Sequence, residues 1–169
     1  MMSLLLLAAF IPSSPDLGKA EGQCRPDEPG PGFLVEVVGL KDHAGVLKLE
    51  VYPSNNEDFL QDDNILLNAG KVFRRVEADV PQGTRVSMCI RVPAPGAYSL
   101  SLLHDRDRNR KFGWTVDGIG FASNPRLGWS KPKAGATRAV AGTGLTRIPI
   151  VLNYCSGLGV APLAEYRGR

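Results

Sequence analysis

Residues 85–104, RVSMCIRVPAPGAYSLSLLH, decide the fold of this chain. In the first half, every second residue from Val86 to Val92 is apolar, so these side chains share one face of an extended strand. Pro93 to Gly96 supplies proline and glycine for a turn, and residues 97–104 return as a second, mostly apolar strand. The stretch therefore predicts two β-strands joined by a tight connection.

Similar patterns flank this stretch on both sides. Further strands are predicted, in chain order, at residues 33–40, 46–52, 72–80 and 145–154. The turn-like residues 41–45 predict that the first two form a hairpin, Pro149 indicates a sheet edge or a bulge, and residues 57–68 fit a short helix or an irregular connection. Strands with one apolar face need a second layer, which predicts an all-β fold, an antiparallel immunoglobulin-like or transthyretin-like β-sandwich.

Length and composition bound the organisation of the chain. Its 169 residues suffice for one well-buried domain, and 19 Gly and 13 Pro leave little room for long helices. We expect a signal segment at residues 1–22, a Pro/Gly-rich arm at 23–32, the sandwich at 33–154 and a loosely ordered tail at 155–169. The net charge of +3 gives no case for nucleic-acid binding.

The apolar run from Leu4 to Ile11 resembles the later part of a secretory signal and is too short to span a bilayer. The small residues Ala20 and Gly22 make cleavage before Gln23 plausible, although a basic region at the start is missing. The sequence therefore predicts a periplasmic or secreted protein without a transmembrane segment.

The three cysteines, Cys24, Cys89 and Cys155, lack the close spacing of zinc or dithiol redox sites. In an oxidising compartment we expect Cys24 to pair with Cys89, because this bridge ties the N-terminal arm to a central strand. The alternative, for a cytosolic chain, is three free buried thiols.

A polar loop follows the strand that ends at His104. Asp105, Asp107 and Asn109 place oxygen-bearing side chains at alternate positions, a spacing that can direct three oxygens at one calcium ion. Arg110 stands where a calcium loop favours glycine, and Gly113 offers no side-chain oxygen. The alternative is a turn closed by hydrogen bonds from its own backbone. No cofactor other than calcium is predicted.

Basic and aromatic residues alternate in and after this loop. The predicted binding surface comprises His104, Arg106, Arg108, Lys111, Trp114, Phe121, Asn124 and Trp129. Such residues can bind an anionic polymer, a carbohydrate or an envelope lipid. The plainer interpretation is that the aromatic side chains close the open end of the core and the basic side chains face solvent. His104 and Asp105 are neighbours on a strand and point to opposite faces, so a hydrolase built on them is the least favoured hypothesis and no enzyme is predicted.

Several motifs together carry a family resemblance. They are Pro95-Gly96-Ala97-Tyr98, then His104-Asp105-x-Asp107-x-Asn109, then Gly120-Phe121-Ala122-Ser123-Asn124. From about Phe33 to Tyr154 the chain resembles the bacterial family named domain of unknown function 2141. The resemblance implies an exported β-sandwich and adds no reaction, substrate or cofactor. His104, Asp105, Asp107, Asn109 and Lys111 map onto the family's usual loop, and Arg110 and Gly113 depart from it.

These observations predict an exported binding or structural module of the bacterial envelope, whose loops from Asp105 to Lys133 meet an envelope component. The alternative is an accessory domain stabilised by calcium at Asp105, Asp107 and Asn109.

Overall fold

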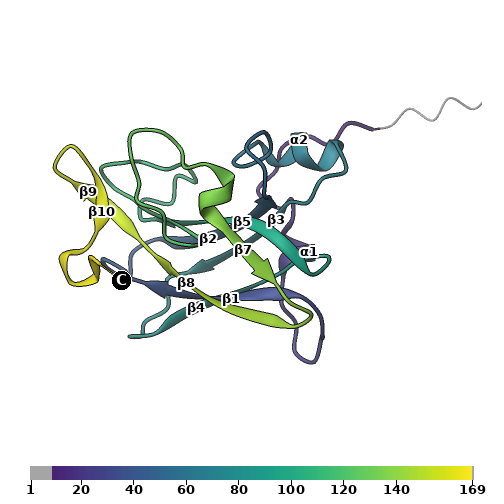
Figure 1. Cartoon of the computed structure of the whole chain (residues 1–169), viewed down its shortest axis with the longest axis horizontal. Helices are drawn as coiled ribbons and strands as arrows, with labels where there is room; N and C mark the ends of the chain where they lie inside the picture. The colour runs from purple at the N-terminus through teal and green to yellow at the C-terminus, as the bar shows by residue number, and fades with distance from the viewer. Residues whose placement is uncertain (1–8, 169) are drawn as a thin grey trace, which may run out of the picture.

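The computed structural model describes residues 9–168, which form two β-sheets packed face to face (Figure 1). The small sheet has the order β4-β1-β8 and the large sheet the order β10-β9-β6-β5-β2-β3, with β7 paired to the start of β5. The strands are β1 (Gly32–Val38), β2 (Val46–Pro53), β3 (Arg74–Asp79), β4 (Val86–Arg91), β5 (Gly96–Asp105), β6 (Gly118–Phe121), β7 (Arg138–Ala141), β8 (Leu145–Val151), β9 (Asn153–Ser156) and β10 (Gly159–Pro162). The predicted β-sandwich is confirmed, while its finer likeness to an immunoglobulin or transthyretin sandwich stays a prediction.

The main core lies between the two sheets and consists of the alternating apolar residues. Val86, Met88 and Ile90 of β4 are buried there, opposite Leu100 and Leu102 of β5. Burying one such side chain contributes roughly 1.5–3 kcal/mol to the stability of the fold. The alternating apolar residues that predict the strands therefore also hold the two sheets together.

The predicted hairpin of residues 33–40 and 46–52 is wrong. β1 pairs with β4 and β8 in the small sheet, whereas β2 pairs with β3 and β5 in the large sheet. The chain also changes sheets between β3 and β4, between β4 and β5, between β7 and β8, and at Leu152 between β8 and β9. Two strands that bury their apolar faces in one core show the same alternation whether they lie in one sheet or in facing sheets. The pattern alone therefore does not distinguish a hairpin from two strands in opposite layers.

Pairing within the sheets is antiparallel except between β1 and β8, which run parallel. β8 is an edge strand, and its Pro149 lies opposite Glu36. Proline lacks the N–H that a central strand donates on both sides, so the edge position suits it.

Short helices cover parts of the sandwich. They are α1 (Lys19–Gly22), α2 (Asp63–Asn68), η1 (Ala134–Thr137) and η2 (Ala164–Tyr166). α2 lies in the segment predicted as a short helix or an irregular connection, and it stands at one end of the large sheet, with the β9–β10 hairpin at the other (Figure 1). Within residues 9–168, no helix combines the length and apolar character needed to cross a membrane.

A second, smaller core lies away from the first, beneath α2 and η1. It contains Tyr52, Phe59, Leu66, Phe73, Phe121 and Ala134. The rings of Phe59 and Phe121 meet edge to face with centroids 5.9 Å apart. The large sheet is therefore covered by side chains on both faces along part of its length.

The segment before β1 packs along the side of the sandwich. The carbonyl oxygen of Gly18 accepts from the backbone N–H of Arg75 in β3, and Gln23 forms a β-bridge with Ile90 in β4. Cys24 forms a disulfide with Cys89, as predicted, and Cys155 is free and exposed. Of the predicted signal segment, residues 1–8 lie outside the described residues, and the cleavage site stays a prediction.

Replacing Cys24 and Cys89 together with serine is expected to lower the free energy of unfolding by about 2–4 kcal/mol, because the bridge restricts the unfolded chain. The two cysteines are 65 residues apart, so the closed loop is long. Urea denaturation followed by circular dichroism measures the change, and Cys155→Ser is the matched control without an expected effect. Equal stability of the double variant and the native chain would contradict this role.

Candidate functional site

The outer face of the large sheet carries two aligned rows of side chains. The rows, read from β2 through β5 to β6, are Lys48, Leu103, Ile119 and Glu50, Ser101, Phe121. Side chains at alternate strand positions share a face, so both rows point away from the main core. Two loops, residues 106–117 and 122–133, and the strand β10 surround these rows.

Between the rows and the loops lies a cavity of about 520 Å³. Its walls are mostly apolar, and the apolar lining residues are Leu60, Leu103, Phe112, Trp114, Ile119, Phe121, Leu127, Trp129, Pro132 and Val160. Pockets that bind small molecules have volumes of roughly 300–1,000 Å³ and combine such walls with a few polar groups. The cavity therefore has the size and the surface of a small-molecule site.

Three aromatic side chains of the cavity wall remain open to solvent. Phe112 is 44% exposed, Trp114 is 40% exposed and Trp129 is 83% exposed. The rings of Trp114 and Trp129 come from different loops, and their centroids are 6.1 Å apart. Exposed large apolar side chains that gather at one opening mark a binding surface more often than scattered ones do.

The loop that carries Phe112 and Trp114 is held by buried carboxylates. Asp117 accepts from the backbone N–H groups of Arg106 (2.8 Å) and Gly113 (2.7 Å). Asp105 accepts from those of Asn109 (3.1 Å) and Arg110 (2.8 Å). Hydrogen bonds from backbone to a carboxylate are stronger than those to a neutral acceptor, so these two aspartates fix the path of the cavity wall.

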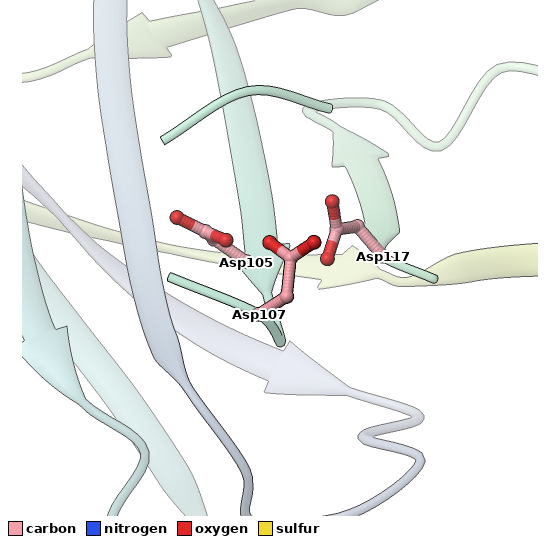
Figure 2. A group of neighbouring side chains, drawn as sticks. All are labelled: Asp105, Asp107 and Asp117. Atoms are coloured by element: carbon pink, nitrogen blue, oxygen red, sulfur yellow. The ribbon is translucent and has the colours of Figure 1, made fainter. Parts of the chain in front are cut away.

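Three carboxylates of this loop gather in one place (Figure 2). One oxygen each of Asp105, Asp107 and Asp117 lies within 4.8 Å of the others, which is a spacing compatible with a shared cation. Asp117 was missed by the sequence analysis because it lies a dozen positions along the chain, and only the folding of the loop brings it to Asp105. The predicted ligand Asn109 donates from its side chain to Asp107 (2.9 Å), and its side-chain oxygen accepts from the backbone N–H of Lys111 (2.8 Å).

The arginines of the loop turn away from these carboxylates. Their ion pairs, in chain order, are Arg106 with Asp42, Arg108 with Asp79 and Arg110 with Glu77. The hydrogen bond from Arg106 lowers the pKa of Asp42, and Arg110 and Lys19 together lower that of Glu77 against the opposing effect of its burial. Arg110 has φ of 67°, so it occupies the left-handed conformation for which a calcium loop favours glycine.

The predicted binding residues fall into two groups. Trp114, Phe121 and Trp129 line the cavity. Lys111 is exposed outside it, and the side-chain oxygen of Asn124 accepts from the backbone N–H of Val151 (2.8 Å), a structural role. Sequence reasoning missed the sheet residues of the floor, such as Leu103 and Ile119; their signal is apolar character on the face opposite to the main core.

His104 belongs to the interior and not to the surface. It is 0% exposed, and its ring lies between Tyr154 and the turn at Ala44. The Ala44 carbonyl only accepts, so Nε2 donates to it (2.8 Å); the Tyr154 hydroxyl accepts from the backbone of Lys41 and donates to Nδ1 (2.7 Å). The neutral ring satisfies every partner, and burial lowers the pKa of His104 below its ordinary value.

Gly118 makes room for this network. A Cβ atom at this position would overlap the Tyr154 ring.

His104 and Asp105 point to opposite faces of β5, with Asp105 bound to loop N–H groups, so the two side chains do not meet.

The comparison with protein families gives one finding. A family model described as "Uncharacterized protein conserved in bacteria (DUF2141)" matches residues 35–148, which agrees with the resemblance carried by the sequence motifs. The matched region includes the 105–117 loop and both tryptophans. Searches of curated proteins and of solved structures give no significant match.

The neutral, buried state of His104 predicts a loss of stability in mild acid. Its pKa is lowered in the folded chain from 6.5, so below about pH 6.5 the unfolded chain binds a proton that the folded chain excludes. The free energy of unfolding is expected to fall between pH 7.5 and pH 5, by at most about 1.4 kcal/mol per pH unit for one proton.

Urea denaturation at several pH values measures this slope. His104→Gln should flatten it, whereas His43→Gln, at the chain's other histidine, should leave it intact. A slope that persists in His104→Gln would assign the effect to other groups.

Proposed function

The chain belongs to this family of uncharacterized bacterial proteins, DUF2141, and we propose that it is an exported module that binds a small apolar ligand in the cavity on the outer face of its large sheet. The observation that carries the proposal is the cavity of about 520 Å³ with its partly exposed aromatic rim. Apolar surface left in contact with water costs free energy, and a ligand that covers it recovers that cost.

Export is supported by the Cys24–Cys89 disulfide, because such bridges persist in oxidising compartments and are rare in the cytosol. The leader-like sequence from Leu4 to Ile11 points in the same direction. A periplasmic or secreted location would place the cavity where it meets molecules of the cell envelope.

The rigid position of the cavity supports ligand binding over a purely structural role. Its floor consists of strand residues, whose positions are set by the sheet, and its outer wall is fixed by Asp105 and Asp117. A preformed site loses little conformational entropy when a ligand enters.

Binding of the neutral apolar dye N-phenyl-1-naphthylamine tests the proposal. The chain has two tryptophans and both line the cavity, so the dye is expected to quench intrinsic fluorescence and to saturate at one molecule per chain. Replacing both Phe112 and Trp129 with alanine removes two wall side chains and should weaken binding by about tenfold.

Val140→Ala is the matched control, because Val140 is also an exposed apolar residue and lies on β7 outside the cavity. This variant should bind like the native chain. Dye binding that is absent, or that is insensitive to the change at Phe112 and Trp129, would refute the cavity as the site.

A second candidate is an accessory domain stabilised by calcium at Asp105 and Asp107. The sequence predicts Asn109 as the third ligand of this site. The observation that favours it is the approach of Asp117 to these two, while the loop's arginines pair elsewhere. Calcium prefers oxygen ligands of this type, and three negative charges in one place would be relieved by the cation.

Thermal unfolding with calcium and with chelator tests this candidate. A site in the folded chain should raise the midpoint as calcium increases through the millimolar range. Asp107→Asn should abolish the shift, and Asp62→Asn, at an exposed aspartate in another loop, should preserve it. Equal midpoints with calcium and with chelator would rule out calcium stabilisation.

A further inference from the structure

The floor of the cavity changes in character from one side to the other. On the β2 side it consists of the charged residues Lys48 and Glu50, and on the β6 side of the apolar residues Ile119 and Phe121. Sheet pairing fixes the order of these side chains, because neighbouring strands are about 4.8 Å apart. A ligand that lies across the floor therefore meets a charged region at one end and apolar side chains at the other.

The carboxylate on this floor is already engaged. One oxygen of Glu50 accepts from Nε of Arg75 (2.8 Å), and the other accepts from the hydroxyl of Tyr52 (2.7 Å). The ammonium of Lys48 lies at 3.5 Å from the oxygen that Arg75 occupies. Glu50 is therefore shared between two cations, and Arg75 has the shorter contact.

A second cation stands in the wall of the cavity. The ammonium group of Lys131 donates to the backbone carbonyl of Phe59 at 3.1 Å, which is a neutral acceptor. An ammonium group has three N–H donors, so this contact leaves donors for another acceptor. Lys48, Lys131 and Glu50 together give the lining of the cavity a net charge of +1 (two positive charges and one negative charge).

We propose that the cavity binds an amphipathic anion, a carboxylate with a single short alkyl chain, whose head group pairs with Lys48 and Lys131 and whose chain lies over Leu103, Ile119 and Phe121. The inference rests on the proposed binding function and names the ligand class. Charge complementarity selects the acidic head group, and the apolar floor along β6 selects the chain.

Two other ligand classes fit the cavity less well. A saccharide needs several polar side chains around it, whereas the lining offers few, and Glu50 is occupied by Arg75 and Tyr52. A lipid with two acyl chains exceeds a volume of about 520 Å³, which suits one short chain.

Three probes with an unbranched ten-carbon chain and head groups of different charge test the inference by isothermal titration calorimetry. They are decanoate, decanol and decyltrimethylammonium, each below its aggregation threshold. Decanoate should bind about tenfold more tightly than decanol, since charge-assisted hydrogen bonds from an ammonium group to a carboxylate are stronger than those to a neutral hydroxyl. Decyltrimethylammonium should bind more weakly than decanol, because its charge repels the two lysines.

The outcomes separate this inference from the proposed function. If decanol and decanoate bind equally, the ligand class is wrong and the apolar site stands. If neither binds and the dye does not bind, both fail. The protein is also mixed with phosphatidylglycerol vesicles and sedimented. If it sediments with the vesicles and decanoate does not release it, the ligand is a membrane surface and not a free carboxylate.

Variants of the two lysines locate the head group. Lys48→Met and Lys131→Met keep most of the length of the side chain and remove its charge, and each should weaken decanoate binding severalfold while leaving decanol binding unchanged. Unchanged decanol binding also shows that the cavity is intact in the variant. Lys133→Met is the matched control, because Lys133 is exposed two positions beyond Lys131 and does not line the cavity. Decanoate binding that is insensitive to both changes would overturn the inference.

Discussion

The burial of both faces of β5 is the constraint on which the rest of the structure depends. On one face Leu100, Leu102 and His104 enter the space between the sheets, and on the other Ser101, Leu103 and Asp105 lie beneath the loops. A strand that is buried on both faces can neither slip by one residue nor leave its place, because a shift would move every side chain to the wrong side. β2, β6 and β7 take their positions from this strand.

The polar loop and the apolar cavity are parts of one arrangement. Asp105 is the last residue of β5, and with Asp117 it gathers the backbone N–H groups of the loop that carries Phe112 and Trp114. Asp105, which the sequence presents as a candidate metal ligand, thereby also shapes the wall of a cavity that is lined by no acidic residue of this loop. Binding at the cavity and order in the loop are expected to depend on each other.

The alternation of apolar and polar residues in the sequence predicts the strands, the residues of the main core and the β-sandwich. The sequence also predicts the Cys24–Cys89 pair and three aromatic residues of the cavity, Trp114, Phe121 and Trp129. It does not predict which strands are neighbours, because alternation is the same in either layer; the mistaken hairpin of residues 33–52 has this origin. The cavity itself was not predictable, since Lys48, Leu103 and Val160 meet only after four separate strand pairings have formed.

The N-terminal segment contacts two edge strands on the same side of the sandwich, β3 of the large sheet and β4 of the small sheet. Gly18 binds the backbone of β3 and Gln23 that of β4, with the disulfide beside them. The rim of a sheet offers unpaired backbone groups on which other copies of a chain can assemble. In the uncleaved chain this segment therefore covers both edges, and a chain that loses it would expose the backbone groups of β3 and β4 to pairing with other copies.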